Sequence, residues 1–296
     1  MKIADVGPIS DSLILLGDRN VCMYLLKGDR YLLLGGGMSY VVPSVEEQMD
    51  RFGVDRDRIM GLLILHSHFD HTTAAPYFMQ AYPEMEIMAS AGTKKVMGIE
   101  KAVKNIAALD RDTRRLYGVD NRFRGISLEF KPPEITRTLG DGDTVDLGGG
   151  VGISILETPG HSKCSITAYE PALQYLFPSD GVPLPVLDEG QLMLMANDNI
   201  AQYLKSLERM ASLEVAAVCC EHGGAVHGED ATSFLQQGLE LTRSKYTDYR
   251  RAMQSGADAR ELARHEVDKI LKSRAFGLIP EDVLLNVVTA MILSAA

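Results

Sequence analysis

A continuous apolar segment that leads straight into a cluster of histidines constrains this chain more than any other feature. Residues 59–65 carry no charge and are almost all apolar, and His66-Ser67-His68-Phe69-Asp70-His71 follows directly. An apolar run of this length without alternation is typical of a strand buried on both faces, in a sheet covered by helices. The sequence therefore predicts a covered sheet with a polar loop at the end of this strand.

The composition of that polar loop indicates metal binding. The chain has seven histidines, and three of them lie within residues 66–71. Imidazole nitrogen and carboxylate oxygen are ligands that zinc, iron and manganese accept. In an extended chain, residues two apart point to the same side, so His66 and His68 are placed to bind one ion. Asp70 and His71 follow where the backbone turns into the next helix, and we expect them to face a second ion nearby.

Two metal ions need more ligands than one loop supplies, and the sequence offers candidates at later strand ends. His161 follows a Thr-Pro-Gly turn, Asp180 follows a predicted strand over 175–177, and His222 follows another over 215–220. Any one of these histidines, taken alone, is more often a structural residue than a ligand. The loop cluster and three strand-end residues together favour a metal site. The predicted metal ligands are therefore His66, His68, Asp70, His71, His161, Asp180 and His222.

The remaining pattern predicts a sheet-rich body followed by a helical tail. Strands are predicted over 12–16, 21–26, 31–34, 59–65, 144–147, 152–157, 165–169, 175–177 and 215–220. Helices are predicted over 45–52, 73–81 and 200–212, together with a helical insertion over 98–124. From residue 231 onward the apolar spacing is three and four throughout, as in helices. We therefore expect an α/β catalytic domain over 1–230 and an all-helical C-terminal extension over 231–296.

Charge and composition restrict the partners. The formal net charge of −10 argues against a long nucleic acid, whose binding proteins usually carry a basic surface. It does not exclude a small anionic substrate, because a bound metal can dominate the local field. No segment reaches the roughly 18 apolar residues of a membrane span, and the N-terminus is a poor secretory signal. Four scattered cysteines are too few for a disulfide framework. We expect a cytoplasmic protein with a small-molecule substrate and no membrane partner.

The seven candidate ligands, in their order and spacing, resemble those of the metallo-β-lactamase superfamily: His66-x-His68-x-Asp70-His71, then His161, Asp180 and His222. The resemblance implies a four-layered αβ/βα sandwich with the metals at the edge between two sheets. It implies that His66, His68 and His161 hold the first metal. Asp70, His71 and His222 would then hold the second metal, and Asp180 would bridge the two.

One departure from the family pattern concerns the early strand over 31–34. Family members often have an aspartate and a glycine after this strand, whereas Leu34 is followed here by Gly35-Gly36-Gly37. The missing carboxylate would lie behind the metal ligands. Its absence is expected to change the tuning of the metals without removing a ligand. Ser67 and Ser179, which neighbour the candidate ligands, are expected to support them rather than to act as nucleophiles.

The helical insertion and the helical tail together resemble a narrower, thioesterase-like branch of the family, of the quinolone-signal response protein type. In that branch, such a tail folds over the metal site. The match rests on architecture and length rather than on motifs. Whether the tail of this chain acts as a lid, as a homodimer contact or as a surface for a protein partner stays open.

The expected activity is hydrolysis of a small ester or thioester by a hydroxide that bridges two divalent metals. A water between metals about 3.5–4 Å apart loses its proton near neutral pH. Asp70, as a carboxylate beside this nucleophile, is placed to take or relay a proton. A phosphodiesterase or lactonase is the alternative within the same chemistry. A signalling protein that acts through a protein partner, with incidental hydrolysis, is the alternative of another class. Zinc, iron and manganese all remain candidates for the metal.

Overall fold

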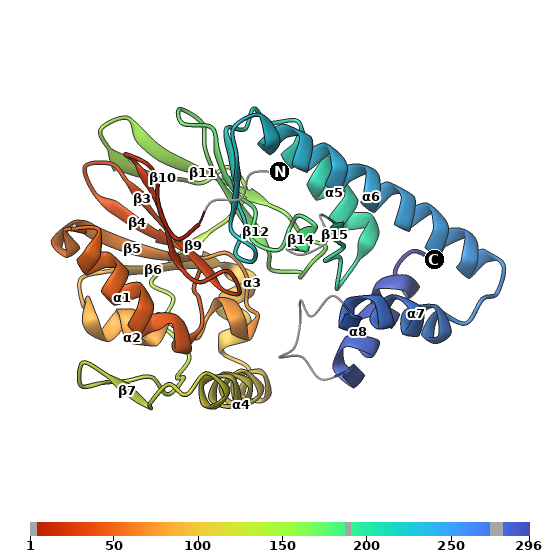
Figure 1. The fold of residues 1–296 in the computed structure, drawn as a ribbon, viewed down its shortest axis with the longest axis horizontal. Coiled ribbons are helices and arrows are strands. Elements are labelled where there is room, and N and C mark those ends of the chain that lie inside the picture. Colours follow the sequence, from red (N-terminus) through yellow and green to blue (C-terminus); the bar gives the residue numbers. More distant parts are fainter. Residues whose placement is uncertain (1–4, 187–190, 273–280) are drawn as a thin grey trace.

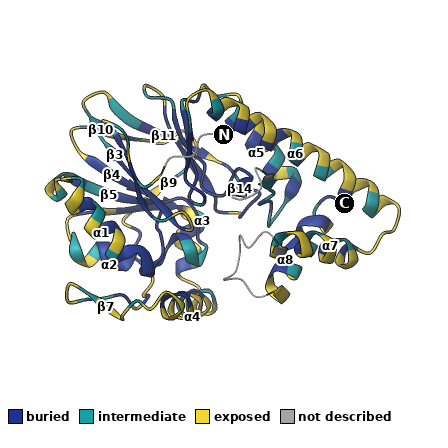
Figure 2. Cartoon of the chain, viewed as in Figure 1, coloured by how far each residue is buried: buried dark blue, intermediate teal, exposed yellow. Residues whose placement is uncertain are grey.

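Two β-sheets lie face to face at the centre of the molecule, and helices cover their outer faces (Figure 1). The computed structural model describes residues 5–186, 191–272 and 281–296. Buried strands fill the middle of the molecule, whereas the outward sides of the helices are exposed (Figure 2). Among the described helices, none is long and apolar enough to cross a membrane.

The first sheet has seven strands in the order β1-β2-β3-β4-β5-β6-β9. Strands β1 to β4 are antiparallel neighbours, and β4, β5, β6 and β9 pair in parallel. The parallel arrangement brings the carboxyl ends of β4 and β5 to the same edge. The strands are β1 (Gly7–Ser10), β2 (Leu13–Gly17), β3 (Cys22–Lys27), β4 (Tyr31–Leu34), β5 (Ile59–Ile64), β6 (Glu86–Ser90) and β9 (Arg137–Leu139).

The second sheet has six strands in the order β10-β11-β12-β13-β16-β17. All its neighbouring strands are antiparallel except β13 and β16, which run in parallel. The strands are β10 (Thr144–Gly148), β11 (Val151–Glu157), β12 (Ile166–Glu170), β13 (Tyr175–Phe177), β16 (Ala217–Cys219) and β17 (Ala225–His227). Two separate hairpins are formed by β7 (Arg122–Phe123) with β8 (Ile126–Ser127), and by β14 (Leu184–Val186) with β15 (Gln191–Met193).

The described helices follow the layers of the sandwich. Three short 3-10 helices lie in the first half of the chain: η1 (Ser39–Val41), η2 (Arg56–Arg58) and η3 (Phe69–His71). The α-helices of the body are α1 (Val42–Arg51), α2 (Ala75–Ala81), α3 (Ala91–Met97), α4 (Glu100–Leu116) and α5 (Ile200–Ala211). The C-terminal helices are α6 (Glu229–Gln254), α7 (Ala259–Lys272) and α8 (Glu281–Leu293).

Strand β4 illustrates why the central strands read as continuous apolar runs. Leu33 packs into a core shared with α1 and α2, whereas Leu32 and Leu34 pack into the core between the two sheets. Strand β5 divides its side chains in the same way. Because both faces of the strand are covered, neither set of alternate positions needs to be polar.

A third core lies on the outer face of the second sheet. There Leu176 of β13 and Val218 of β16 pack with Tyr203 of α5 and Phe234 of α6. The layers are therefore helices α1 and α2, the first sheet, the second sheet, and helices α5 and α6. The predicted four-layered αβ/βα sandwich with C-terminal helices is confirmed.

The predicted elements agree with the structure except in the short ones. The insertion predicted over 98–124 contains helix α4 and ends in the β7–β8 hairpin instead of continuing as helix. Strands β1, β6, β9, β14, β15 and β17 and the short helix α3 were not predicted, because stretches of three to seven residues without clear periodicity carry little signal. The cores extend across residue 230, since Phe234 shares a core with the second sheet. The domain boundary at 230/231 stays a prediction.

Candidate metal centre

The loop that carries the first four candidate ligands is held against the end of strand β4. After β5 the chain turns through His66 and His68 into helix η3, which contains Asp70 and His71. A Cβ at Gly36 would lie 1.9 Å from the carbonyl oxygen of His71, so only glycine allows the two segments to approach this closely. Gly36, which the sequence indicates only as part of a strand end, is therefore needed for this loop to pack against strand β4.

The other three candidates arrive from the second sheet. His161 lies in the loop between β11 and β12, Asp180 follows β13, and His222 follows β16. Because β13 and β16 are parallel neighbours, the residues that follow them emerge side by side. The backbone amide of Ile166 donates to the carbonyl of Leu65 at 2.9 Å, which joins the two sheets beside the site.

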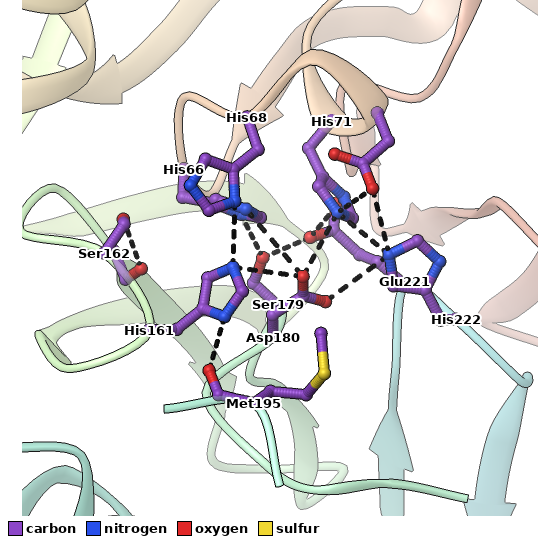
Figure 3. A network of polar contacts seen from close by, with 12 residues as sticks. His66, His68, His71, His161, Ser162, Ser179, Asp180, Met195, Glu221 and His222 are labelled. Atoms are coloured by element: carbon purple, nitrogen blue, oxygen red, sulfur yellow. Dashed lines mark hydrogen bonds and ion pairs between the residues drawn. The ribbon is translucent and has the colours of Figure 1, made fainter. Parts of the chain in front are cut away.

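The structure brings all seven predicted residues together at one edge of the sandwich, in two groups that both contact Asp180. Figure 3 shows the five histidines around Asp180. In the first group, His161 Nε2 lies 2.9 Å from His68 Nδ1 and 3.2 Å from Asp180 Oδ2. His66 Nε2 lies 3.9 Å from the same carboxylate oxygen. Three imidazole nitrogens and one carboxylate oxygen thus converge on one point.

The second group lies on the other side of Asp180. His71 Nε2 and His222 Nε2 are 3.0 Å apart, and each lies 3.5 Å from Asp70 Oδ2. Asp180 turns Oδ2 toward His71 at 3.4 Å and Oδ1 toward His222 at 3.7 Å. Asp180 therefore touches both groups, as a bridging ligand would.

Contacts on the outer nitrogens of the rings test whether a cation fits. His161 Nδ1 donates to the carbonyl of Met195 at 2.6 Å, and His222 Nδ1 donates to the carbonyl of Asn20. In a neutral imidazole the other nitrogen, Nε2, then carries a lone pair. His66 Nε2 and Asp180 Oδ1 are also buried without a hydrogen-bond partner among the described residues. Buried lone pairs that face one another repel unless a positive charge lies between them, so this donor set fits divalent metals.

Burial sets the protonation of the first group. It lowers the pKa of His66, His68 and His161, that of His68 to about 4. These three imidazoles are therefore neutral near pH 7. A metal that binds there displaces no proton from them.

The second group holds its protons differently. Burial acts to lower the pKa of His71 and His222, but the neighbouring carboxylates together outweigh it and raise both pKa values: Glu221, Asp70 and Asp180 at His71, and Asp180 and Asp70 at His222. Burial acts to raise the pKa of Asp70 and Asp180, but the neighbouring histidines outweigh it and lower both. This group therefore retains positive charge, either as protons or as a bound cation.

Two residues of the site were not among the predicted ligands. The Glu221 carboxylate, 1% exposed, lies behind the rings, where its Oε2 is 3.1 Å from His71 Nδ1. Ser179 donates its hydroxyl to the same oxygen and lies 2.8 Å from His66 Nδ1. The sequence predicts a supporting role for Ser179, and its contacts agree with that role. Glu221 gave no signal beyond its place next to His222.

Other polar residues near the motifs have ordinary structural positions. Cys164 packs beside the site, where its thiol donates to the hydroxyl of Ser67 at 3.2 Å. The four cysteines are all buried free thiols. His227 lies in strand β17 and belongs to neither histidine group of the centre.

The fold and the site together define the class: a two-sheet, metal-dependent hydrolase fold with its histidine and aspartate side chains at the sheet edge. The sequence model of the metallo-beta-lactamase superfamily matches residues 16–222. The chain belongs to the metallo-beta-lactamase superfamily.

Solved structures of the family share this fold. The metallo-beta-lactamase family protein TTHA1429 from Thermus thermophilus is 19% identical, with a TM-score of 0.64 over 96% of this chain and 92% of that one. The archaeal superfamily protein ST1585 from Sulfolobus tokodaii is 19% identical, with a TM-score of 0.59 over 78% of this chain and 86% of that one. The flavodiiron protein from Giardia intestinalis is 12% identical, with a TM-score of 0.58 over 83% of this chain and 61% of that one.

Proposed function

We propose that this protein binds two divalent metal ions and hydrolyses a small ester or thioester. The observation that carries the proposal is the contact between His71 Nε2 and His222 Nε2 at 3.0 Å, with the Asp70 carboxylate 3.5 Å from both. Such a group is stable only around positive charge. The first group, of His66, His68 and His161 with Asp180, offers a matching set of donors.

The residues of the chain have distinct tasks in this proposal. His66, His68 and His161 hold one metal, Asp70, His71 and His222 hold the other, and Asp180 joins the two. When bound, such a metal pair lowers the pKa of water and polarises the bond under attack. Asp70, which is half-buried while Asp180 is buried, is the carboxylate placed to accept or relay a proton.

The class of substrate is supported by charge and architecture. The net charge of −10 disfavours a long polyanion but leaves small acyl compounds open. The C-terminal helices share a core with the segment that leads from Met195 to helix α5, and the carbonyl of Met195 accepts a hydrogen bond from His161. A tail attached this close to a ligand is consistent with the thioesterase-like branch.

The test combines elemental analysis with a substrate panel. Protein purified without added metal is analysed for zinc, iron and manganese, then assayed with acyl thioesters, aryl esters, lactones and bis(p-nitrophenyl) phosphate. We expect two metal ions per chain and turnover of an ester or thioester. In Asp180→Ala and His161→Ala, metal content and turnover should fall, turnover by roughly 100-fold or more, since even indirect partners of a metal cost 10–100-fold. His227→Ala is the matched control and should change neither.

Two results would redirect the proposal. A protein with two bound metals that cleaves no ester or thioester in the panel would refute the substrate class. Turnover of bis(p-nitrophenyl) phosphate well above thioester turnover would favour the phosphodiesterase alternative instead.

A further inference from the structure

The carboxylate of Glu221 is buried behind the metal centre, and the neighbouring residue, Gly35, has no side chain to occupy the same volume. Gly35, which follows strand β4, has φ +88°, and a Cβ there would lie 2.7 Å from Glu221 Oε1. A residue with any side chain at position 35 would therefore compete with Glu221 for the same volume. The family pattern predicts a carboxylate directly after strand β4, and this chain has none there. The carboxylate of Glu221, which follows strand β16, lies beside that position instead.

Glu221 reaches one ligand of each metal group. Directly, its Oε2 lies 3.1 Å from His71 Nδ1 in the second group. Through Ser179, whose hydroxyl lies 2.8 Å from His66 Nδ1, it reaches the first group. Ser179 has φ +53°, a conformation that serine rarely adopts, and in it the hydroxyl lies between the ring and the carboxylate.

The direction of these hydrogen bonds follows from donor and acceptor chemistry. The Ser179 hydroxyl donates its proton to the Glu221 carboxylate. The Ser179 oxygen then accepts from His66 Nδ1–H, which leaves a lone pair on His66 Nε2. At His71 the contact is an ion pair, and the carboxylate 3.1 Å from Nδ1 favours a proton on that nitrogen, which leaves Nε2 as the nitrogen for a metal. In both rings the nitrogen left to bind a metal, Nε2, is the one that faces Asp180.

We propose that Glu221 is a positioning residue that orients one ligand of each metal, His71 by direct contact and His66 through Ser179. This inference rests on the proposed metal centre and adds a residue that binds no metal itself. A carboxylate behind an imidazole fixes the ring and its tautomer and strengthens its bond to the metal. Because one carboxylate serves both rings, its loss should weaken both metals, whereas loss of the Ser179 hydroxyl should weaken only the metal held by His66.

The test measures zinc affinity rather than turnover. Zinc is removed from the full-length protein and from its variants, then added back in competition with a chromophoric chelator. We expect Glu221→Gln to weaken both zinc ions by about 10–100-fold, and Ser179→Ala to weaken one of them to a similar degree. Glu170→Gln is the matched control, because Glu170, the last residue of strand β12, is equally buried but accepts a hydrogen bond from the backbone amide of Leu173. The zinc affinity of this variant should equal that of the wild type.

A second readout reports the tautomers themselves. In metal-free protein, where the His66 imidazole is neutral, its ¹⁵N shifts should place the proton on Nδ1, and this preference should be lost in Glu221→Gln. Unchanged zinc affinity in that variant overturns the inference. If Glu221→Gln does not fold, Ser179→Ala decides: one weakened zinc supports the inference, and two unchanged ones overturn it. Wild-type protein that binds no zinc, iron or manganese would instead refute the proposed metal centre.

Discussion

At the scale of single residues, Gly35 offers a test of how tightly the site is packed. Gly35→Ala would add a Cβ 2.7 Å from Glu221 Oε1, at a position where φ is +88°. The strained backbone costs about 1–2 kcal/mol and the crowding about 1–3 kcal/mol more. We expect the free energy of unfolding, measured by urea denaturation, to fall by the sum of the two.

Gly142 provides the matched control for this prediction. Its φ is +83°, yet nothing lies within 4 Å of a Cβ there. In Gly142→Ala the free energy of unfolding should therefore fall only by the cost of the strained backbone. Equal losses in the two variants would mean that the Glu221 carboxylate moves aside freely and that position 35 is not crowded.

The type and position of single residues also explain which residues of the site could be predicted from the sequence. Five of the predicted ligands are histidines, of which the chain has only seven, and they recur with aspartates at strand ends, so type and place together carried the signal. Glu221 lacks such a signal, because successive residues near a strand end point to opposite sides. That it reaches the backs of two other rings depends on packing between sheets, which local sequence does not encode.

At the scale of elements, helix α8 is fixed to the start of helix α5. The hydroxyl of Ser294 accepts a hydrogen bond from the amide of Ile200 at 3.0 Å, and Ile292 is fully buried in the core that Ile200 shares. The apolar spacing predicted these helices but could not show where they pack, because an apolar face fits many partners. A role of the extension in dimerisation stays a prediction.

Helix α8 also allows a comparison between neighbouring side chains. Ile292→Ala should lower the free energy of unfolding by about 2–5 kcal/mol, because it opens a cavity in the core. Leu293, 54% exposed, is the control. Leu293→Ala should change the free energy of unfolding by less than about 0.5 kcal/mol. Urea denaturation of both variants measures the difference. Equal and small effects would mean that α8 contributes little to the stability of the body.

At the scale of the whole molecule, the two metal groups join the two sheets. Four of the candidate ligands follow strand β5 of the first sheet, and the other three come from loops of the second. Without metals, main-chain hydrogen bonds hold the sheets together here, from Ile166 to Leu65 and from Cys22 to Glu221. The apolar runs made the covered sheets predictable. The packing of one sheet against the other depends on contacts between residues distant in sequence. This packing was predicted from the family resemblance and not from the apolar runs.

The metals should therefore stabilise the entire fold and not only the site. A ligand that binds only the folded state at 100 times its Kd adds about 2.7 kcal/mol, so two metals would add about 5 kcal/mol. For a chain somewhat longer than 250 residues, this corresponds to a rise in Tm of roughly 10 °C. We expect a strong chelator to lower the Tm of the wild type by about this amount in differential scanning calorimetry. Asp180→Ala, which removes the carboxylate between both groups, should start from the lower Tm and respond little to chelator. A wild type whose Tm does not change with chelator would contradict this prediction. It would show that the metals do not contribute to the contact between the two sheets.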